Sequence, residues 1–170
     1  MATASKNASA VAAAGTGAPF ELTSLVGFVV YRLSATLGSL GERDAQEVAG
    51  LSLPEYRCMA TLATKGSMGV IALCQAMMID KAWVSRTLSR LQDKGLVASA
   101  SDREDARRTV YGTTPKGRRL ARRLIQRALQ RQRAVLEGLS EAERGQLAAL
   151  LARMQHNADR MKDAAVATTL

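Results

Sequence analysis

The sequence predicts a mainly α-helical protein of the α+β class, in which one small β-hairpin interrupts a series of helices. Apolar residues recur at helical spacing in most segments, and only two short runs, Leu96–Ser99 and Thr109–Thr113, are β-prone. Aromatic residues make up only 4% of the 170 residues, so the core is expected to consist of Leu, Ala, Val and Met. Such a composition favours helices over a large sheet.

The first 18 residues are expected to form a disordered tail. They are mostly Ala, Ser, Thr and Gly, and they cannot bury enough surface to offset the entropy lost on ordering. A signal peptide is the alternative interpretation, but the segment has no continuous apolar centre. Residues 19–163 are then expected to form a single domain, and residues 164–170 a frayed C-terminus.

Two helices are expected before the central segment. The first covers Phe20 to about Leu40 and carries a wide apolar stripe, and its end is expected near Gly41. A polar connection over residues 42–50 follows. The second helix is expected to begin near Ser52, with a proline in its first turn, and to stop before Gly66.

Two short helices joined by three residues are expected next, over Val70–Met77 and from Lys81 to about Lys94. Asp80 is a good N-cap for the second helix, which has an apolar stripe on one face. The opposite face is polar and basic, with Lys81, Ser85, Arg86, Ser89 and Arg90. This pattern is typical of a helix-turn-helix whose second helix recognises DNA.

The two β-prone runs enclose a charged, turn-like tip, which predicts a basic hairpin, or wing, beside that helix. Arg103 is expected at the wing tip, where it can enter a narrow minor groove of negative potential. Arg107 and Arg108 share the same tip. The aspartates of the tip are also explained by ordinary turn chemistry.

Two long helices are expected after the wing, one from Pro115 to about Glu137 and one opened by a capping box at Ser140–Glu143. The first and the last two helices carry more apolar surface than a small domain can cover. The sequence therefore predicts a homodimer with interleaved terminal helices. The DNA-binding lobe is expected at about 52–117, and the dimerisation helices at about 20–41 and 118–162.

Three segments resemble one known family. The run Asp102–Arg108, the tetrapeptide Thr114–Gly117 and the segment Lys81–Arg86 are similar to the wing and the recognition helix of the MarR-type (multiple antibiotic resistance regulator) transcriptional regulators. The resemblance covers Phe20 to about Met161. It implies a winged helix-turn-helix lobe in a homodimer, and small ligands, often phenolic or aromatic acids, between the lobe and the dimer helices. It also implies that Asp105 and Arg107 form a pair that braces the hairpin.

The charge balance suits a polyanionic partner. The chain has 24 Lys and Arg against 15 Asp and Glu, a net charge of +9, which favours nucleic acid over a membrane. No apolar run approaches the about 20 residues of a membrane-spanning helix. Two cysteines without a secretory signal indicate reduced thiols in the cytoplasm. A single histidine and the lack of a glycine-rich phosphate loop argue against an enzyme, and neither a cofactor nor a metal is expected.

The residues expected to contact double-stranded DNA are Lys81, Trp83, Ser85, Arg86, Ser89, Arg90, Arg103, Arg107 and Arg108. Arg86 and Arg90 lie one turn apart, and either can bind a guanine edge or a phosphate. Trp83 either touches a thymine methyl or a sugar, or packs across its own helix.

A dimeric repressor that binds a palindromic operator and is released by a small ligand is the function expected from these features. Tyr31, Arg32, Tyr56 and Arg57 are the candidates to line the ligand cleft. A non-specific architectural DNA-binding protein is the first alternative. The second is a redox-sensing regulator that uses Cys58 or Cys74, although Cys74 is expected to be a buried structural thiol at a helix crossing.

Overall fold

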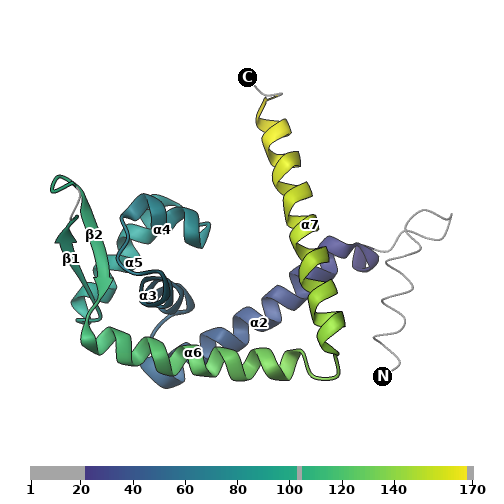
Figure 1. Cartoon of the computed structure of the whole chain (residues 1–170), viewed down its shortest axis with the longest axis horizontal. Helices are drawn as coiled ribbons and strands as arrows, with labels where there is room; N and C mark the ends of the chain where they lie inside the picture. The colour runs from purple at the N-terminus through teal and green to yellow at the C-terminus, as the bar shows by residue number, and fades with distance from the viewer. Residues whose placement is uncertain (1–21, 103–104, 168–170) are drawn as a thin grey trace. The chain divides into compact units, whose positions relative to one another are not determined.

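A computed structural model of the chain describes residues 22–102 and 105–167 (Figure 1). The expected N-terminal tail, the wing-tip residue Arg103 and residues 168–170 lie outside the described part. The described chain is mainly helical with one two-stranded antiparallel sheet, which confirms the expected fold class. It divides into two compact units between Ala128 and Leu129. None of the described helices combines the length and the apolar content that a bilayer crossing demands.

The first long helix is longer than the sequence pattern predicts. A short 3-10 helix, η1 (Leu22–Ser24), precedes α2, which runs over Val26–Ala49 and ends where Gly50 adopts a left-handed conformation with φ 58°. The expected end near Gly41 and the expected polar connection over 42–50 are therefore wrong. Residues 42–49 are mostly good helix formers, and Gly41 is buried within the helix, so nothing local ends the helix before Gly50.

Three shorter helices follow: α3 (Leu53–Lys65), α4 (Val70–Met77) and α5 (Lys81–Asp93). A capping box of Ser52 and Glu55 opens α3, and Asp80 caps α5. The three helices pack against one another beside the β-hairpin (Figure 1). Their buried apolar residues form most of one core, which includes Cys58, Met59, Leu62, Leu73, Val84, Leu88 and Leu91.

The hairpin consists of β1 (Val97–Ser101) and β2 (Thr109–Thr113), paired antiparallel. Its register places Val97 opposite Thr113 and Ser101 opposite Thr109. The chain before α4 adds a bridge to the same sheet, because Met68 and Tyr111 exchange two backbone hydrogen bonds of 3.0 and 2.9 Å. This bridge anchors the start of the helix-turn-helix to the wing, and nothing in the sequence pattern indicates it.

Two long helices complete the chain, α6 (Pro115–Val135) and α7 (Glu141–Ala167). The expected capping box opens α7, since Ser140 donates to Glu143 from both its backbone nitrogen and its hydroxyl at 2.7 Å. The helix continues past the expected frayed end at residue 164. Its large apolar side chains are exposed in this single chain: Leu147, Leu150, Leu151, Met154 and Met161.

Candidate DNA-binding surface

Helix α5 presents a rigid polar face. Val84, Leu88 and Leu91 are buried in the core, so the rotation of the helix is determined by packing. At its start, Asp80 Oδ1 accepts a hydrogen bond of 2.9 Å from the backbone nitrogen of Trp83. The six residues of this helix that were expected to contact DNA are all exposed: Lys81, Trp83, Ser85, Arg86, Ser89 and Arg90.

Trp83 is 41% exposed, so it is not part of the buried core. An exposed aromatic ring early in a recognition helix offers a flat apolar surface to a thymine methyl or a sugar. The geometry is thus compatible with the contact expected from the sequence.

The turn between α4 and α5 contains an unusual backbone conformation. Met78 has φ 55° and ψ 42°, in the left-handed region, and it is the one non-glycine residue with positive φ in the described chain. Its backbone nitrogen donates to the carbonyl oxygen of Cys74, as does that of Ile79. These bonds close α4 and direct the chain into α5.

Asp105 braces the hairpin through both Arg107 and Arg108. Asp105 Oδ2 lies 3.3 Å from Nε of Arg108, and its other carboxylate oxygen accepts a hydrogen bond of 3.0 Å from the backbone nitrogen of Arg107. The expected Asp105–Arg107 pair is thus formed through the backbone amide of Arg107, and the ion pair of Asp105 is with Arg108. The reason is the tight turn, which brings the amide of Arg107, and not its guanidinium, to the carboxylate. Both arginines remain exposed.

A cluster of bonds joins the wing to the start of α6. Thr114 Oγ1 donates to the carbonyl oxygen of Gly95 at 2.9 Å and accepts from the backbone nitrogen of Gly117 at 3.0 Å. A Cβ at Gly117 would clash with the backbone carbonyl of Leu96, so this position requires glycine. The tetrapeptide Thr114–Gly117 thus caps α6 and seats it against the hairpin. The sequence pattern alone assigns this motif no structural role.

Lys94 links the end of α5 to the helices before it. Its Nζ donates to Glu55 Oε1 at 3.0 Å and to the carbonyl oxygen of Gly50 at 3.2 Å. Burial raises the pKa of the Glu55 carboxyl, but hydrogen bonds from Ser52 and Lys94 outweigh it and hold the pKa below its ordinary value. Glu55 is therefore a buried, charged anchor for α5. Sequence reasoning missed this pair because its members are 39 positions apart.

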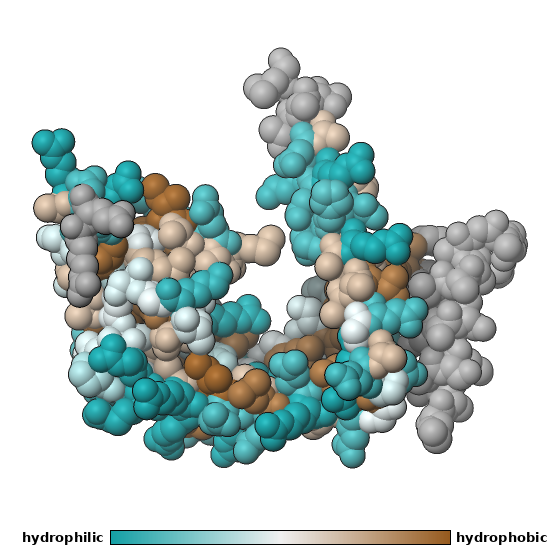
Figure 2. All heavy atoms as spheres, viewed as in Figure 1, coloured by the Kyte–Doolittle hydropathy of each residue, from teal (hydrophilic) through white to brown (hydrophobic). Residues whose placement is uncertain are grey.

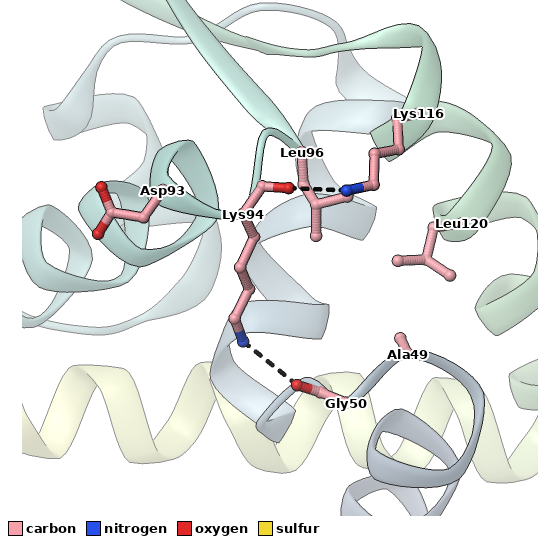
Figure 3. A pocket seen from close by; sticks show the side chains of 7 residues that line it. All are labelled: Ala49, Gly50, Asp93, Lys94, Leu96, Lys116 and Leu120. Atoms are coloured by element: carbon pink, nitrogen blue, oxygen red, sulfur yellow. Dashed lines mark hydrogen bonds between the residues drawn. The ribbon is translucent and has the colours of Figure 1, made fainter.

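A pocket of about 500 Å³ lies where the end of α2, the end of α5 and the start of α6 come together (Figure 3). Figure 3 shows Lys116 donating to the carbonyl oxygen of Lys94, at 3.0 Å, while Asp93 points away from both lysines. The apolar part of the lining is Ala49, Leu96 and Leu120. The charged part is Asp93, Lys94 and Lys116, and both ammonium groups already donate hydrogen bonds, Lys94 to Glu55 and Gly50 and Lys116 to the carbonyl oxygen of Lys94.

The four expected ligand residues do not line this pocket. Tyr31 is 67% exposed on α2, and Arg32 is also exposed. On α3, Arg57 is exposed, whereas Tyr56 is half-buried against the core. Tyr31 contacts a neighbouring ring, that of Phe28, with centroids 6.4 Å apart.

The two cysteines lie in different environments, and that of Cys74 differs from the expectation. Cys58 is fully buried in the core, and burial raises the pKa of its thiol to about 12. Cys74, expected to be the buried structural thiol, is only half-buried. The reason is that α4 presents Leu73 to the core and leaves Cys74 at its margin. A thiol with the pKa of Cys58 holds very little thiolate near neutral pH, so it is a poor redox sensor.

Comparison with known proteins supports the prediction that this surface binds DNA. The model of the MarR family matches residues 51–109. The transcriptional regulatory protein proposed for the hcr operon of Thauera aromatica is 29% identical over 112 residues, 66% of this chain and 68% of that protein. The transcriptional regulator HosA of Escherichia coli O157:H7 is 31% identical over 78 residues, 46% of this chain and 58% of HosA.

A solved structure extends the similarity to the whole fold. BpsR of Bordetella bronchiseptica superposes with a TM-score of 0.70 at 25% identity, over 81% of this chain and 97% of BpsR. The BpsR structure concerns the regulation of DNA binding by 6-hydroxynicotinic acid.

Proposed function

Because the chain belongs to the MarR family of DNA-binding transcriptional regulators, we propose that it is a homodimeric repressor that a small aromatic or phenolic acid releases from a palindromic operator. The exposed polar face of α5 is the observation that carries this proposal. Arg86 and Arg90 lie one turn apart on that face, and the buried stripe of α5 holds them in a constant orientation. An arginine held in this way can donate two hydrogen bonds to one guanine.

The wing supplies contacts to the DNA backbone in this proposal. Arg107 and Arg108 are exposed beside the Asp105 turn, within reach of phosphates next to the groove that α5 enters. Arg103, which lies outside the described residues, is proposed to enter the adjacent minor groove. These contacts orient the lobe, while the α5 side chains recognise bases.

The dimer follows from apolar surface that a single chain leaves uncovered. Leu25, directly before α2, is exposed, as are Val26, Val30 and Leu33 on α2. Helix α7 exposes a comparable stripe that ends at Met161, which is 73% exposed. Contiguous apolar faces of this kind are typical of helices that pack against a second copy. Two lobes related by a twofold axis then bind a palindromic site, with half-sites about 10 base pairs apart. The proposed compartment is the cytoplasm, where the operator DNA is.

An acidic effector is supported by the similarity to BpsR. Two locations in this chain offer cations beside apolar or aromatic groups. One is the set of Tyr31, Arg32, Tyr56 and Arg57, and the other is the pocket with Lys94 and Lys116. Loss of ligand binding in Arg57→Ala but not in Lys116→Ala assigns the effector to the first location, and the reverse result assigns it to the second.

The test of the proposed function begins with selection of a bound sequence from random duplexes by the purified protein. Arg86→Ala is then expected to cost about 1–3 kcal/mol per half-site on the selected duplex and to leave binding to random DNA nearly unchanged. Arg160→Ala, on α7, serves as the matched control. If the wild-type protein enriches no sequence, the non-specific architectural function replaces the repressor. A folded monomer at micromolar concentration in sedimentation contradicts the dimer.

Release by a ligand has its own test. A ligand that shifts the protein away from DNA must bind the DNA-free form more tightly. Calorimetric titration of 6-hydroxynicotinic acid and related aromatic acids, with and without the selected duplex, measures that difference. DNA must weaken ligand binding by the same factor by which the ligand weakens DNA binding. Equal affinities for a ligand that does release DNA contradict the scheme.

A further inference from the structure

The positive charge of the chain is concentrated on one helix. α6 contains eight basic residues and no acidic one, whereas the net charge of the whole chain is +9. The rest of the chain is thus nearly neutral. No acidic residue occurs between Asp105 and Glu137, so the sequence places no counter-charge on either side of α6 for many positions. Helices that are merely solvated usually carry charges of both signs.

Three arginines form the outer face of α6. Gly117, Ala121 and Leu124 are buried, and the opposite side of the helix carries Arg119, Arg122 and Arg123, all exposed. These three arginines, here named the α6 basic face, make no ion pair with any residue of the described chain. Figure 2 shows hydrophilic side chains along the lower edge of the view, where α6 lies.

The α6 basic face has an energetic cost in the free protein. Arg119 lies three and four positions before the other two, so it is a neighbour of both Arg122 and Arg123 on the helix surface. Like charges at these spacings destabilise a helix by a few tenths of a kcal/mol per pair. An anionic partner with closely spaced charges removes this repulsion, and arginine forks suit phosphate oxygens in particular.

The α6 basic face is held at a constant distance from the recognition helix. Thr114 binds the start of α6 to the turn before β1, and Lys116 Nζ donates to the carbonyl oxygen of Lys94 at the end of α5. Gly117 packs directly against the backbone of Leu96. The first turns of α6 are therefore joined rigidly to the end of α5 and to the base of the wing.

We propose that the α6 basic face is a second DNA contact, which binds the phosphate backbone of the duplex that flanks the operator. The contact is electrostatic and independent of sequence, so it extends the bound length without changing which operator is chosen. It rests on DNA binding by the α5 and wing surface, but not on the identity of the operator or of the effector.

The test compares two variants of equal charge on two probes. Arg119→Gln/Arg122→Gln/Arg123→Gln removes the α6 basic face, and Arg153→Gln/Arg160→Gln/Lys162→Gln removes three exposed charges from α7. Half-sites one turn apart fit within about 20 base pairs. The affinity for a random-sequence duplex of that length therefore measures only the contacts made by α5 and the wing. A random duplex of about 45 base pairs adds more than one turn of flanking DNA on each side.

The expected result is a loss confined to the α6 variant and to the long probe. The slope of log affinity against log salt is expected to fall by about 0.9 for each lost phosphate contact, or about 3 per protomer. The short probe is expected to bind both variants as it binds the wild-type protein. Because Gln and Arg have similar helix propensity, circular dichroism is expected to show a folded α6 variant.

Four outcomes overturn the proposal. Equal losses in the α6 and α7 variants show a general effect of net charge. An equal loss on both probes places the arginines under the lobe and not beside it. Unchanged binding of both probes shows that the α6 basic face is only solvated. Binding of phosphatidylglycerol vesicles by the wild-type protein but not by the α6 variant, with DNA binding unaffected, shows that the partner is a membrane. If the wild-type protein does not bind the short probe at all, the result contradicts the proposed function and not this inference.

Discussion

Lys94 Nζ donates a hydrogen bond of 3.0 Å to Glu55 Oε1, and this contact joins the residue after the recognition helix α5 to the first turn of α3. Glu55 is buried, and it also accepts hydrogen bonds from the backbone nitrogen and the hydroxyl of Ser52. One carboxylate therefore caps α3 and anchors the end of α5. The orientation of the DNA-binding face depends on a side chain that does not itself reach DNA.

Replacement of Glu55 by glutamine is expected to destabilise the lobe by about 1–3 kcal/mol, because a neutral amide with one acceptor oxygen replaces the carboxylate that Ser52 and Lys94 hydrogen-bond. Urea unfolding measures this as a lower midpoint with an unchanged slope. Lys94→Met is expected to cost less, since the Lys94 side chain is partly exposed and solvent screens its charge. In a double-mutant cycle the two changes are expected to be non-additive. If the two free-energy changes are strictly additive, the interaction between the two side chains contributes nothing to the free energy of unfolding.

The same carboxylate predicts a pH dependence. The pKa of Glu55 is lowered from its ordinary value of 4.5, so the unfolded chain binds its proton more tightly than the folded chain does. The stability from this group is present above pH 4.5 and is lost as the pH falls through the lower folded value. Thermal unfolding across this range measures the loss. Glu143, whose pKa is also lowered, contributes in the same direction, so the informative comparison is Glu55→Gln against Glu143→Gln.

Gly117→Ala is expected to destabilise the protein by about 1–3 kcal/mol, because the added Cβ meets the backbone carbonyl of Leu96, which cannot move like a flexible side chain. Gly145 on α7 provides the control, since a Cβ there meets nothing within 4 Å. Gly145→Ala is expected to stabilise its helix by about 0.5–1 kcal/mol. Differential scanning calorimetry separates the two signs. A neutral Gly117→Ala would show that α6 can shift away from the hairpin.

Cys58 is expected to resist alkylation in the folded protein. Its thiol is buried, with a pKa of about 12, so neither access nor thiolate is available near neutral pH. Iodoacetamide treatment followed by mass spectrometry is expected to label Cys58 only after unfolding in urea. Cys58→Ala is expected to leave the response of DNA binding to peroxide unchanged. Rapid labelling of native Cys58 would restore the redox-sensing alternative.

Several elements of the candidate site could be predicted from the sequence because their signals are local. The bounds of α4 and the start of α5 follow from Asp80 and from the apolar spacing around Val84. The capping box at Ser140–Glu143 depends on residues three positions apart. The exposed polar face of α5 follows from the same periodicity that buries its apolar stripe. A DNA-binding helix-turn-helix was therefore predictable before any tertiary contact was known.

The sequence by itself determined the fold class, the order of the elements, the basic character of α6 and the residues that α5 exposes. Only the tertiary structure decided where α2 ends, which arginine pairs with Asp105 and which cysteine is buried. It alone revealed the Lys94–Glu55 contact and the Met68–Tyr111 bridge. The physical reason is the distance along the sequence over which each interaction acts. Helix caps and apolar periodicity act within about four residues, whereas burial and these contacts join residues that only folding brings together.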